Sequence, residues 1–304
     1  MQNAQKIQLG EYKLTGQNAI TLKALAKINI GLDVTGTRAD GYHMVNMIMQ
    51  TVHMYDVVTV EKTEGNDISM TTDSGFLPTD DSNLCIKAAK LMKEAYPKVQ
   101  GVKIHLEKNI PVAAGMAGGS SDAAAVLYGI NRIYELGLSI EELQEIGVKI
   151  GADVPYCLMR GTALAAGIGE KLTRLPAMMR CPVLIAKPAV SVSTKEVYQA
   201  LDAIADPKHP DIDAMIRDIE NGDLHALASH MGNILEEVTI PMHPEIADIK
   251  KVMMENGAVI SMMSGSGPTV FGFFDDEDTM KRAKEAVEKS GLANVVRYTS
   301  IYNV

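Results

Sequence analysis

Residues 109–127 join a proline bend, a run of very small side chains and the apolar beginning of a helix. Within 113–119 only Met116 has a side chain larger than a methyl group. A ligand can therefore approach this backbone closely and meet a row of N–H groups. A side chain of Ser120–Asp122 is expected to cap the helix, whose positive dipole end favours an anion. The segment predicts a phosphate-binding loop.

Two common nucleotide-binding patterns are missing from this loop. No lysine follows Gly118 or Gly119, so the pattern G-x-x-x-x-G-K-[ST] is absent, and the spacing G-x-G-x-x-G is absent as well. Close packing of two elements is the alternative explanation for so many small residues. Several glycines and a double serine at the start of a helix favour a phosphate site of another architecture.

Composition and charge narrow the classes of partner. The chain has 304 residues, 46% hydrophobic and 22% charged, so it can bury a full core, and its length favours two domains. Its formal net charge of -9 gives no basis for binding nucleic acid or an anionic membrane surface, whereas a small phosphorylated ligand needs only a local positive pocket. No apolar stretch is long enough to span a membrane and the N-terminus has no signal core, which predicts a cytoplasmic protein.

Disulfides and structural metals find little support in the sequence. Cys85, Cys157 and Cys181 are widely spaced and odd in number, without a C-x-x-C pair, which predicts reduced thiols in the core. The histidines form no H-E-x-x-H motif, so no structural metal is expected. A weakly held magnesium ion is compatible with the sequence, because magnesium needs few protein ligands beside phosphate oxygens.

The first half of the chain reads as strands followed by the loop and its helices. We treat residues 1–18 as a partly ordered extension and expect the fold to begin near Ala19. Apolar and β-branched residues at 20–34 and 44–61 predict a hairpin across the polar turn 35–41. The next expected elements are a helix after Asp81–Asn83, a strand at 102–106, the loop helix to about Gly137, a helix capped by Ser139 and Glu142, and a strand at 162–166.

The second half is expected to form a domain of its own. A proline-containing segment within 171–180 suggests a boundary near residue 178, which gives domains 1–178 and 179–304. The expected elements are strands at 183–187, 270–274 and 294–301, a further strand before a glycine-rich turn at 264–268, and helices at 194–204, 211–220, 223–239, 244–256 and 277–289. Strands and helices in both halves predict an α+β protein with a cleft between two domains.

Three short clusters carry polar side chains suited to chemistry beside the loop. Lys27 and Asn29 alternate with apolar residues and so share one face of a strand, although a lysine at a sheet edge is the alternative explanation. Tyr42 and His43 place an aromatic ring beside an imidazole in a turn, where a packed tyrosine is the simpler explanation. Asp153 lies in Gly-Ala-Asp-Val-Pro, where an N-cap is the simpler explanation.

These motifs occur in the order found in the GHMP kinases, and from about Ala19 to Ile301 the chain resembles that family. The family's loop, Pro-x-x-x-Gly-Leu-Gly-Gly-Gly-Ser-Ser-Asn, appears here as Pro-Val-Ala-Ala-Gly-Met-Ala-Gly-Gly-Ser-Ser-Asp. Met116, Ala117 and Asp122 depart from it conservatively, and the charge of Asp122 is expected to face away from the phosphates. The matching segments are Ala26–Ile30, Asp40–His43, Pro111–Ala125, Gly151–Pro155 and Ser264–Thr269.

The resemblance implies a two-domain α+β fold, with an N-terminal domain of a ribosomal-protein type, an α/β C-terminal domain and an active site in the cleft. It also implies transfer of the γ-phosphoryl group of ATP to the 2-hydroxyl of a cytidine-diphosphate-linked methylerythritol, a step of the non-mevalonate isoprenoid pathway. A tertiary alcohol is a poor nucleophile, so Asp153 is the expected general base and Lys27 the cation that keeps it ionised.

The resemblance places the nucleotide at the loop. Adenosine is expected near Asn83 and Lys108, and Ser121 is a candidate ligand of the Mg²⁺ ion, whose ligands are otherwise unassigned. The loop residues expected around the ATP phosphates are Pro111, Val112, Ala113, Ala114, Gly115, Met116, Ala117, Gly118, Gly119, Ser120 and Ser121.

The substrate is expected on the opposite side of the cleft, beside the turn 264–269. Tyr42 and Tyr198 resemble the aromatic pair that sandwiches cytosine, and His43 resembles the residue that reads the polar edge of the base. Asn29 and Thr194 are further expected substrate contacts.

Two other functions stay open on the sequence. One is a GHMP kinase for a different alcohol, such as mevalonate or homoserine, although such a substrate gives Tyr42 and His43 no nucleobase to bind. The other is a catalytically silent member of the fold, against which the retained Lys27, Asp153 and loop serines argue. The sequence assigns neither an oligomeric state nor an order of binding.

Overall fold

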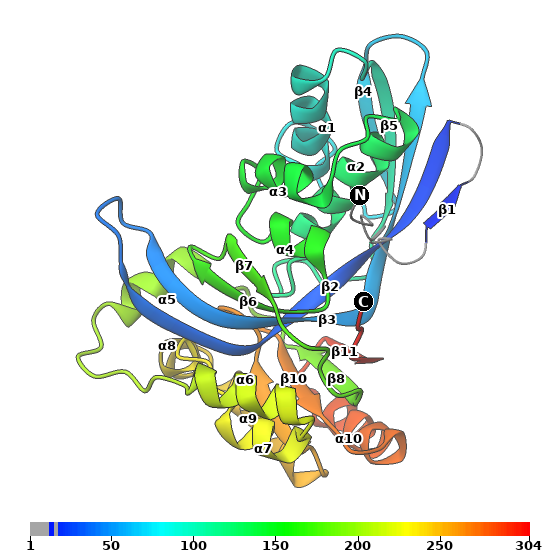
Figure 1. Ribbon diagram of the computed structural model, residues 1–304. Coiled ribbons are helices and arrows are strands. Elements are labelled where there is room, and N and C mark those ends of the chain that lie inside the picture. Colours follow the sequence, from blue (N-terminus) through cyan, green and yellow to red (C-terminus); the bar gives the residue numbers. More distant parts are fainter. Residues whose placement is uncertain (1–11, 15–17) are drawn as a thin grey trace.

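The computed structural model describes residues 12–14 and 18–304, which form two β-sheets covered by helices (Figure 1). The first sheet has seven strands in the hydrogen-bonded order β1-β2-β3-β5-β4, with β6 beside β3 and β7 beside β6. Its pairs are antiparallel except β4 with β5. The strands are β1 (Tyr12–Leu14), β2 (Ala19–Thr37), β3 (His43–Thr63), β4 (Ile68–Thr72), β5 (Gly101–Glu107), β6 (Thr162–Gly167) and β7 (Lys171–Arg174).

Helices of the first half cover this sheet, with the loop helix α2 against β2 and β3 and with α3 packed on the other helices. These helices are α1 (Leu84–Ala95), α2 (Gly118–Ile133), α3 (Ile140–Val148) and α4 (Val154–Met159). The apolar residues of α2 are buried along almost its whole length, which anchors the helix that carries the loop.

The second sheet has four antiparallel strands in the order β11-β8-β10-β9. Helices α9 and α10 pack on it, and α6 packs on the hairpin of the first sheet. The strands are β8 (Pro182–Lys187), β9 (Ile260–Met263), β10 (Val270–Phe273) and β11 (Val295–Ser300). The helices are α5 (Thr194–Leu201), α6 (Ile212–Asn221), α7 (Leu224–His230), α8 (Glu236–Met242), α9 (Glu245–Glu255) and α10 (Glu277–Ser290).

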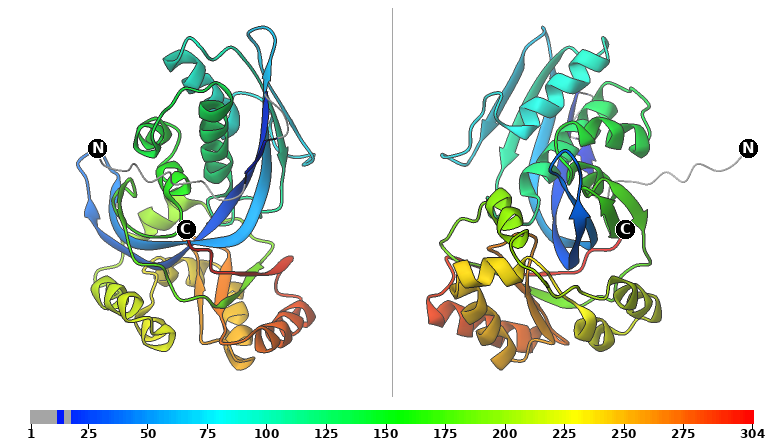
Figure 2. Two further views of the ribbon diagram at one scale, coloured as in Figure 1. Left: turned by 45° about the vertical axis from the view of Figure 1, so that its right-hand side comes forward. Right: turned by 90° about the vertical axis from the view of Figure 1, so that its left-hand side faces the viewer.

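The hairpin of β2 and β3 joins the two halves of the molecule. Its strands have 19 and 21 residues, and Figure 2 shows the hairpin crossing between α1–α4 and the second sheet. Its register shifts between Leu25 and Lys27 and again between Asn29 and Gly31. Irregularities of this kind bend a strand and re-aim its side chains. Lys27 and Asn29 therefore lie on a short stretch that is set off from the regular pleat on both sides.

The two sheets share buried core. One apolar cluster contains Ile28 and Ile30 of β2 together with Phe271 and Phe273 of β10. Gly31 permits the close approach of α6, because a Cβ atom there would lie 2.7 Å from the side chain of Met215. The hairpin thus serves as a wall of both halves, so that side chains on β2 hold a fixed place relative to the second half.

Most of the expected elements are confirmed. β2 begins at Ala19, the Asn83 side chain accepts a hydrogen bond from the N–H of Cys85 at the start of α1, and Ser139 and Glu142 form the expected capping box of α3. Of the expected extension, residues 1–11 and 15–17 lie outside the described residues, whereas Tyr12–Leu14 pairs with β2. The α+β class is confirmed.

The single helix expected at 223–239 is wrong, because the segment forms α7 and α8 instead. Between them, Asn233 pairs with Leu32 of β2 through an isolated parallel bridge. The Asn233 side chain also donates to the carbonyls of Met263 and Gly265, at 2.9 and 2.8 Å. These partners lie far away in the sequence, so helical periodicity could not reveal the break.

The change from one sheet to the other falls between Arg174, at the end of β7, and Pro182, at the start of β8. The expected boundary near residue 178 lies in this interval, and the division into domains 1–178 and 179–304 stays a prediction. The three cysteines are free and buried, as expected. Within residues 12–14 and 18–304, no helix combines the length and apolarity needed to cross a membrane.

Candidate active site

A cavity of about 890 Å³ opens between the loop before α2, the hairpin, helix α5 and the turn between β9 and β10. Every residue that the sequence placed at the nucleotide or the substrate lines this cavity except Met116 and Ser121. Lys27 and Asp153 line it as well. The structure thus brings together side chains that are spread along most of the chain.

The loop reaches α2 through an unusual backbone. Ala113, Gly115 and Ala117 have φ angles of 50°, 69° and 54°, and Ala117 is the N-cap residue of α2. The expected side-chain cap is wrong, because no side chain caps this helix. The N–H groups of its first turn are therefore left to an incoming anion, and Gly118, Gly119 and Ser120 border the cavity there.

Met116 and Ser121 do not face the cavity, which corrects the expectation for both. The Met116 side chain is buried in the core, while its carbonyl accepts the N–H of Lys27 at 3.1 Å. The Ser121 hydroxyl is buried and donates to the carbonyl of Leu25 at 2.7 Å. Ser121 therefore attaches α2 to β2 and does not fit as a magnesium ligand.

Lys27 and Asp153 meet at the cavity. Lys27 is only 5% exposed, so the alternative of a lysine at a sheet edge is wrong. Its Nζ donates to Asn29 Oδ1 at 2.7 Å and lies 3.8 Å from Asp153 Oδ2. Asp153 is the N-cap residue of α4, as the simpler explanation expected, but its side chain makes no capping hydrogen bond. The arrangement holds a cation beside a carboxylate that is partly open to the cavity.

The glycine-rich turn between β9 and β10 touches the loop directly. The buried Ser264 hydroxyl donates to the Gly115 carbonyl at 3.0 Å and accepts the N–H of Asn29 at 3.3 Å. A Cβ atom on Gly115 would lie 2.3 Å from the Ser264 carbonyl. Close packing therefore requires a glycine at position 115, although Gly115 also borders the cavity together with the neighbouring small residues.

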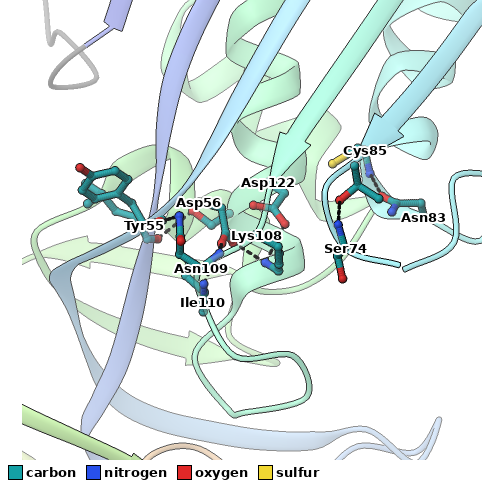
Figure 3. Close-up of polar contacts among 12 residues, drawn as sticks. Tyr55, Asp56, Ser74, Asn83, Cys85, Lys108, Asn109, Ile110 and Asp122 are labelled. Carbon is teal, nitrogen blue, oxygen red and sulfur yellow. Dashed lines mark hydrogen bonds and ion pairs between the residues drawn. The ribbon is translucent and has the colours of Figure 1, made fainter. Parts of the chain in front are cut away.

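A cluster of three buried charged groups clamps the base of the loop (Figure 3). The Lys108 ammonium group contacts the carboxylates of Asp56 and Asp122, the latter at 2.9 Å. Asp56 also accepts the N–H groups of Asn109 and Ile110, at 2.6 and 2.7 Å. Asp56 on β3 and Asp122 on α2 thus hold the residues at which the loop leaves β5. The charge of Asp122 is paired with Lys108, although Asp122 also borders the cavity, so its orientation relative to a phosphate stays a prediction.

Burial and neighbouring charges have opposing effects on the pKa values of Asp122 and Lys108. Burial raises the pKa of the Asp122 carboxyl well above its usual range, and the nearby Lys108 offsets this only in part. Burial alone would lower the pKa of Lys108, but Asp122 and Asp56 together raise it. Lys108 stays a cation, and the Asp122 carboxyl gains a proton more readily than an exposed one.

The substrate side of the cavity is built from both halves. Tyr42 is 60% exposed, so it is not the packed tyrosine of a plain turn. Tyr198 of α5 packs on His43, with ring centroids 4.8 Å apart, and burial together with the charge of Asp153 raises the pKa of Tyr198 to about 12. The hydroxyls of Thr194 and Ser266 lie 2.8 Å apart and tie α5 to the glycine-rich turn.

Two acidic residues of the site escaped the sequence analysis. Asp56 lies within an apolar, β-branched stretch of β3, and a carboxylate in such a stretch was an available signal. Asp202, at the end of α5, bonds His43 and gave no signal, because the two residues are 159 positions apart. In the described part of the chain, no three His, Cys, Asp or Glu side chains converge on a metal site.

Comparisons with known proteins agree with this site. Residues 83–161 match the GHMP kinases N terminal domain, and residues 215–293 match the GHMP kinases C terminal domain. The 4-diphosphocytidyl-2-C-methyl-D-erythritol kinase of Lachnospira eligens is 55% identical over 284 residues, which cover 93% of this chain and 99% of that one. The kinase of the same name from Clostridioides difficile is 52% identical over 279 residues, covering 91% and 94%.

A solved structure extends the likeness to three dimensions. The crystal structure of a 4-(cytidine 5'-diphospho)-2C-methyl-D-erythritol kinase superposes with a TM-score of 0.80 at 30% identity, over 93% of this chain and 100% of that one. Both halves of the chain match the family, and the chain is more than half identical to two kinases over more than nine-tenths of their length. These matches agree on one family. The chain is a kinase of the GHMP kinase family and, within that family, belongs with the 4-diphosphocytidyl-2-C-methyl-D-erythritol kinases.

Proposed function

We propose that this kinase transfers the γ-phosphoryl group of ATP to the 2-hydroxyl of 4-diphosphocytidyl-2-C-methyl-D-erythritol, a step in isoprenoid biosynthesis. The names of its relatives support the substrate. The observation that carries the chemistry is the 3.8 Å approach of Lys27 Nζ to Asp153 Oδ2 in a cavity that the uncapped start of α2 also borders. One cavity then offers a base, a cation and an anion cradle.

In this proposal Asp153 is the general base. The substrate hydroxyl gives its proton to the Asp153 carboxylate while its oxygen forms the bond to the γ-phosphorus, and the bond to the β-γ bridging oxygen breaks, so that ADP leaves. Lys27 stabilises the negative charge on the transferring group and keeps Asp153 ionised. Asn29 orients Lys27 through the 2.7 Å hydrogen bond to its ammonium group.

The nucleotide is proposed to lie along the loop and α2, with its phosphates at the first-turn N–H groups. Adenosine would lie toward Asn83 and Lys108, which border the same cavity. The Asn83 side chain already caps α1 and donates to the Pro78 carbonyl, and two carboxylates hold the Lys108 ammonium group. In the proposal, both residues therefore form the cavity wall with the remaining atoms of their side chains. Mg²⁺, when bound, would neutralise phosphate charge and would rest mainly on phosphate oxygens and water.

The cytidyl group is proposed to lie between Tyr42 and Tyr198, with His43 at its polar edge and with Asn29 and Thr194 as further contacts. Stacking on an aromatic ring contributes about 1–3 kcal/mol per base. A cytoplasmic location is part of the same proposal, since ATP is the phosphoryl donor and the buried cysteines are free thiols.

A turnover assay with one variant tests the proposal. The purified protein, ATP, Mg²⁺ and the cytidyl substrate should release ADP, and Asp153→Asn should lower kcat by roughly 10²- to 10⁴-fold, the range typical of a lost general base. Asp206→Asn, which removes an exposed charge, should leave kcat unchanged. Because the Asp153 side chain caps no helix and is partly open to the cavity, both variants should fold, and thermal unfolding checks this.

Two results would contradict the proposal, and they differ in meaning. Absence of ADP release from the wild type with this substrate would remove the assigned reaction. Undiminished turnover by Asp153→Asn would keep the reaction and remove the role of Asp153.

A further inference from the structure

His43 and Asp202 form a polar pair across the mouth of the cavity. His43 begins β3 and Asp202 ends α5, and His43 Nε2 lies 2.8 Å from Asp202 Oδ1. The His43 side chain is 12% exposed and that of Asp202 is 51% exposed. One face of the His43 ring also packs on Tyr198. The imidazole is therefore held in place both by a ring contact and by a carboxylate.

The carboxylate determines which nitrogen of His43 carries hydrogen. An ionised carboxylate can only accept hydrogen bonds, so Nε2 must be protonated to donate to Asp202. A neutral imidazole then keeps a free lone pair on Nδ1. Among the described residues, Nδ1 makes no hydrogen bond, and His43 borders the cavity. A ligand in the cavity meets His43 as an acceptor.

We propose that Asp202 is a positioning residue that holds His43 in its Nε2–H tautomer and thereby makes the site prefer cytosine over uracil. This inference rests on the proposed function. The 4-amino group of cytosine donates a hydrogen bond and matches the lone pair of Nδ1. The 4-oxo group of uracil accepts one, and it would bring two acceptors together at the same point.

The alternative for this pair is an exposed ion pair with no effect on recognition, since such pairs contribute little to stability. The two explanations differ in what a carboxamide at position 202 would do. Asp202→Asn keeps the size of the side chain but can donate its N–H to Nε2, which releases the Nδ1–H tautomer. That tautomer matches uracil. Asp202→Ala removes the hydrogen-bond partner of Nε2, so that neither tautomer of His43 is selected by residue 202.

The test combines a direct readout of the tautomer with a readout of specificity, on the full chain. Nitrogen-15 NMR at about pH 8 should find His43 of the wild type protonated on Nε2 alone, and Asp202→Asn should shift it toward the Nδ1–H form. The ratio of kcat/KM for the cytidine-linked over the uridine-linked substrate should fall by roughly 10- to 100-fold, the effect of one mismatched buried hydrogen bond. The change should appear in KM rather than in kcat, and Asp202→Ala should give an intermediate ratio.

Asp206→Asn is the matched control, because it removes the same charge four residues along the chain and should change neither readout. The proposal is overturned if wild-type His43 is an imidazolium or carries its hydrogen on Nδ1, or if Asp202→Asn leaves both the tautomer and the ratio unchanged. Should the wild type turn over neither substrate, the proposed function fails. NMR titration with cytidine and uridine monophosphates then decides the role of Asp202 by the same ratio.

Discussion

The surroundings of Asp122 disfavour the negative charge of its carboxylate. It is 2% exposed, it shares Lys108 with Asp56, and its Oδ1 has no hydrogen-bond partner among the described residues. Two carboxylates compete for one ammonium group, and an unpaired buried acceptor costs free energy. The loop pattern of the GHMP kinases has asparagine at this place, which offers the same shape without the charge.

Replacement of Asp122 by asparagine should therefore stabilise the protein increasingly as the pH rises. The raised pKa means that the folded chain holds the Asp122 proton more tightly than the unfolded chain, so unfolding releases a proton. In the wild type, the more tightly held proton stabilises the folded chain fully below the ordinary pKa of 3.8. This contribution is lost as the pH rises through the raised pKa of the folded state. Asp122→Asn has no such loss.

Urea unfolding of both proteins between about pH 4 and about pH 8 measures the effect. The unfolding free energy of Asp122→Asn minus that of the wild type should grow with pH over this range. A difference that does not change with pH would show that the Asp122 carboxyl titrates normally in the folded protein.

At the scale of elements, the loop depends on its contact with the turn between β9 and β10. Gly115 has a φ angle of 69°, and a Cβ atom there would meet the Ser264 carbonyl at 2.3 Å. An alanine would thus have to displace the loop from a turn whose Ser264 hydroxyl also bonds Asn29, beside Lys27. The position of the loop is therefore coupled to the part of β2 that carries Lys27 and Asn29.

Gly115→Ala should lower kcat/KM by at least about tenfold, because small displacements of positioning groups are costly for phosphoryl transfer. Gly222→Ala is a matched control, since Gly222 has a φ angle of 70° but open space around its Cβ position. Both variants should lose about 1–2 kcal/mol of stability from the left-handed backbone. Gly115→Ala should lose more than that because of its contact with the Ser264 carbonyl, and only Gly115→Ala should lose activity. Equal activities of the two variants would contradict this coupling.

The same elements show which features could be predicted from the sequence alone. Starts of α1 and α3 were predicted because their caps are local, within three residues of the helix. The cap predicted for α2 from Ser120–Asp122 was wrong, because the helix already begins at Gly118 and these residues lie inside it. Ser121 is instead bonded to Leu25 of β2, 96 positions away in the chain. Lys27 and Asp153 were found through residue types and a resemblance, whereas the pairing of Asp202 with His43 exists only after α5 has packed on the hairpin.

For the whole molecule, the shared core predicts that the two halves unfold together. Phe271 of β10 is fully buried in the cluster that also holds Ile28 and Ile30 of β2. Phe271→Ala should lower the free energy of unfolding by about 3–5 kcal/mol. Hydrogen exchange followed by mass spectrometry should show α2 and α9 losing protection at the same urea concentration, in the wild type and in the variant. Protection of α2 that outlasts that of α9 would show two independent units.

The buried thiols of the enzyme can serve as intrinsic reporters of when its fold opens. Burial raises the pKa of Cys181 to about 12 and also raises the pKa values of Cys85 and Cys157. Thiolates, not thiols, attack alkylating reagents, so these cysteines are nearly inert while the fold is closed. Cys85 and Cys157 lie in the first half of the chain and Cys181 begins the second. The rate at which each thiol becomes labelled therefore times the opening of its own neighbourhood, without any added probe.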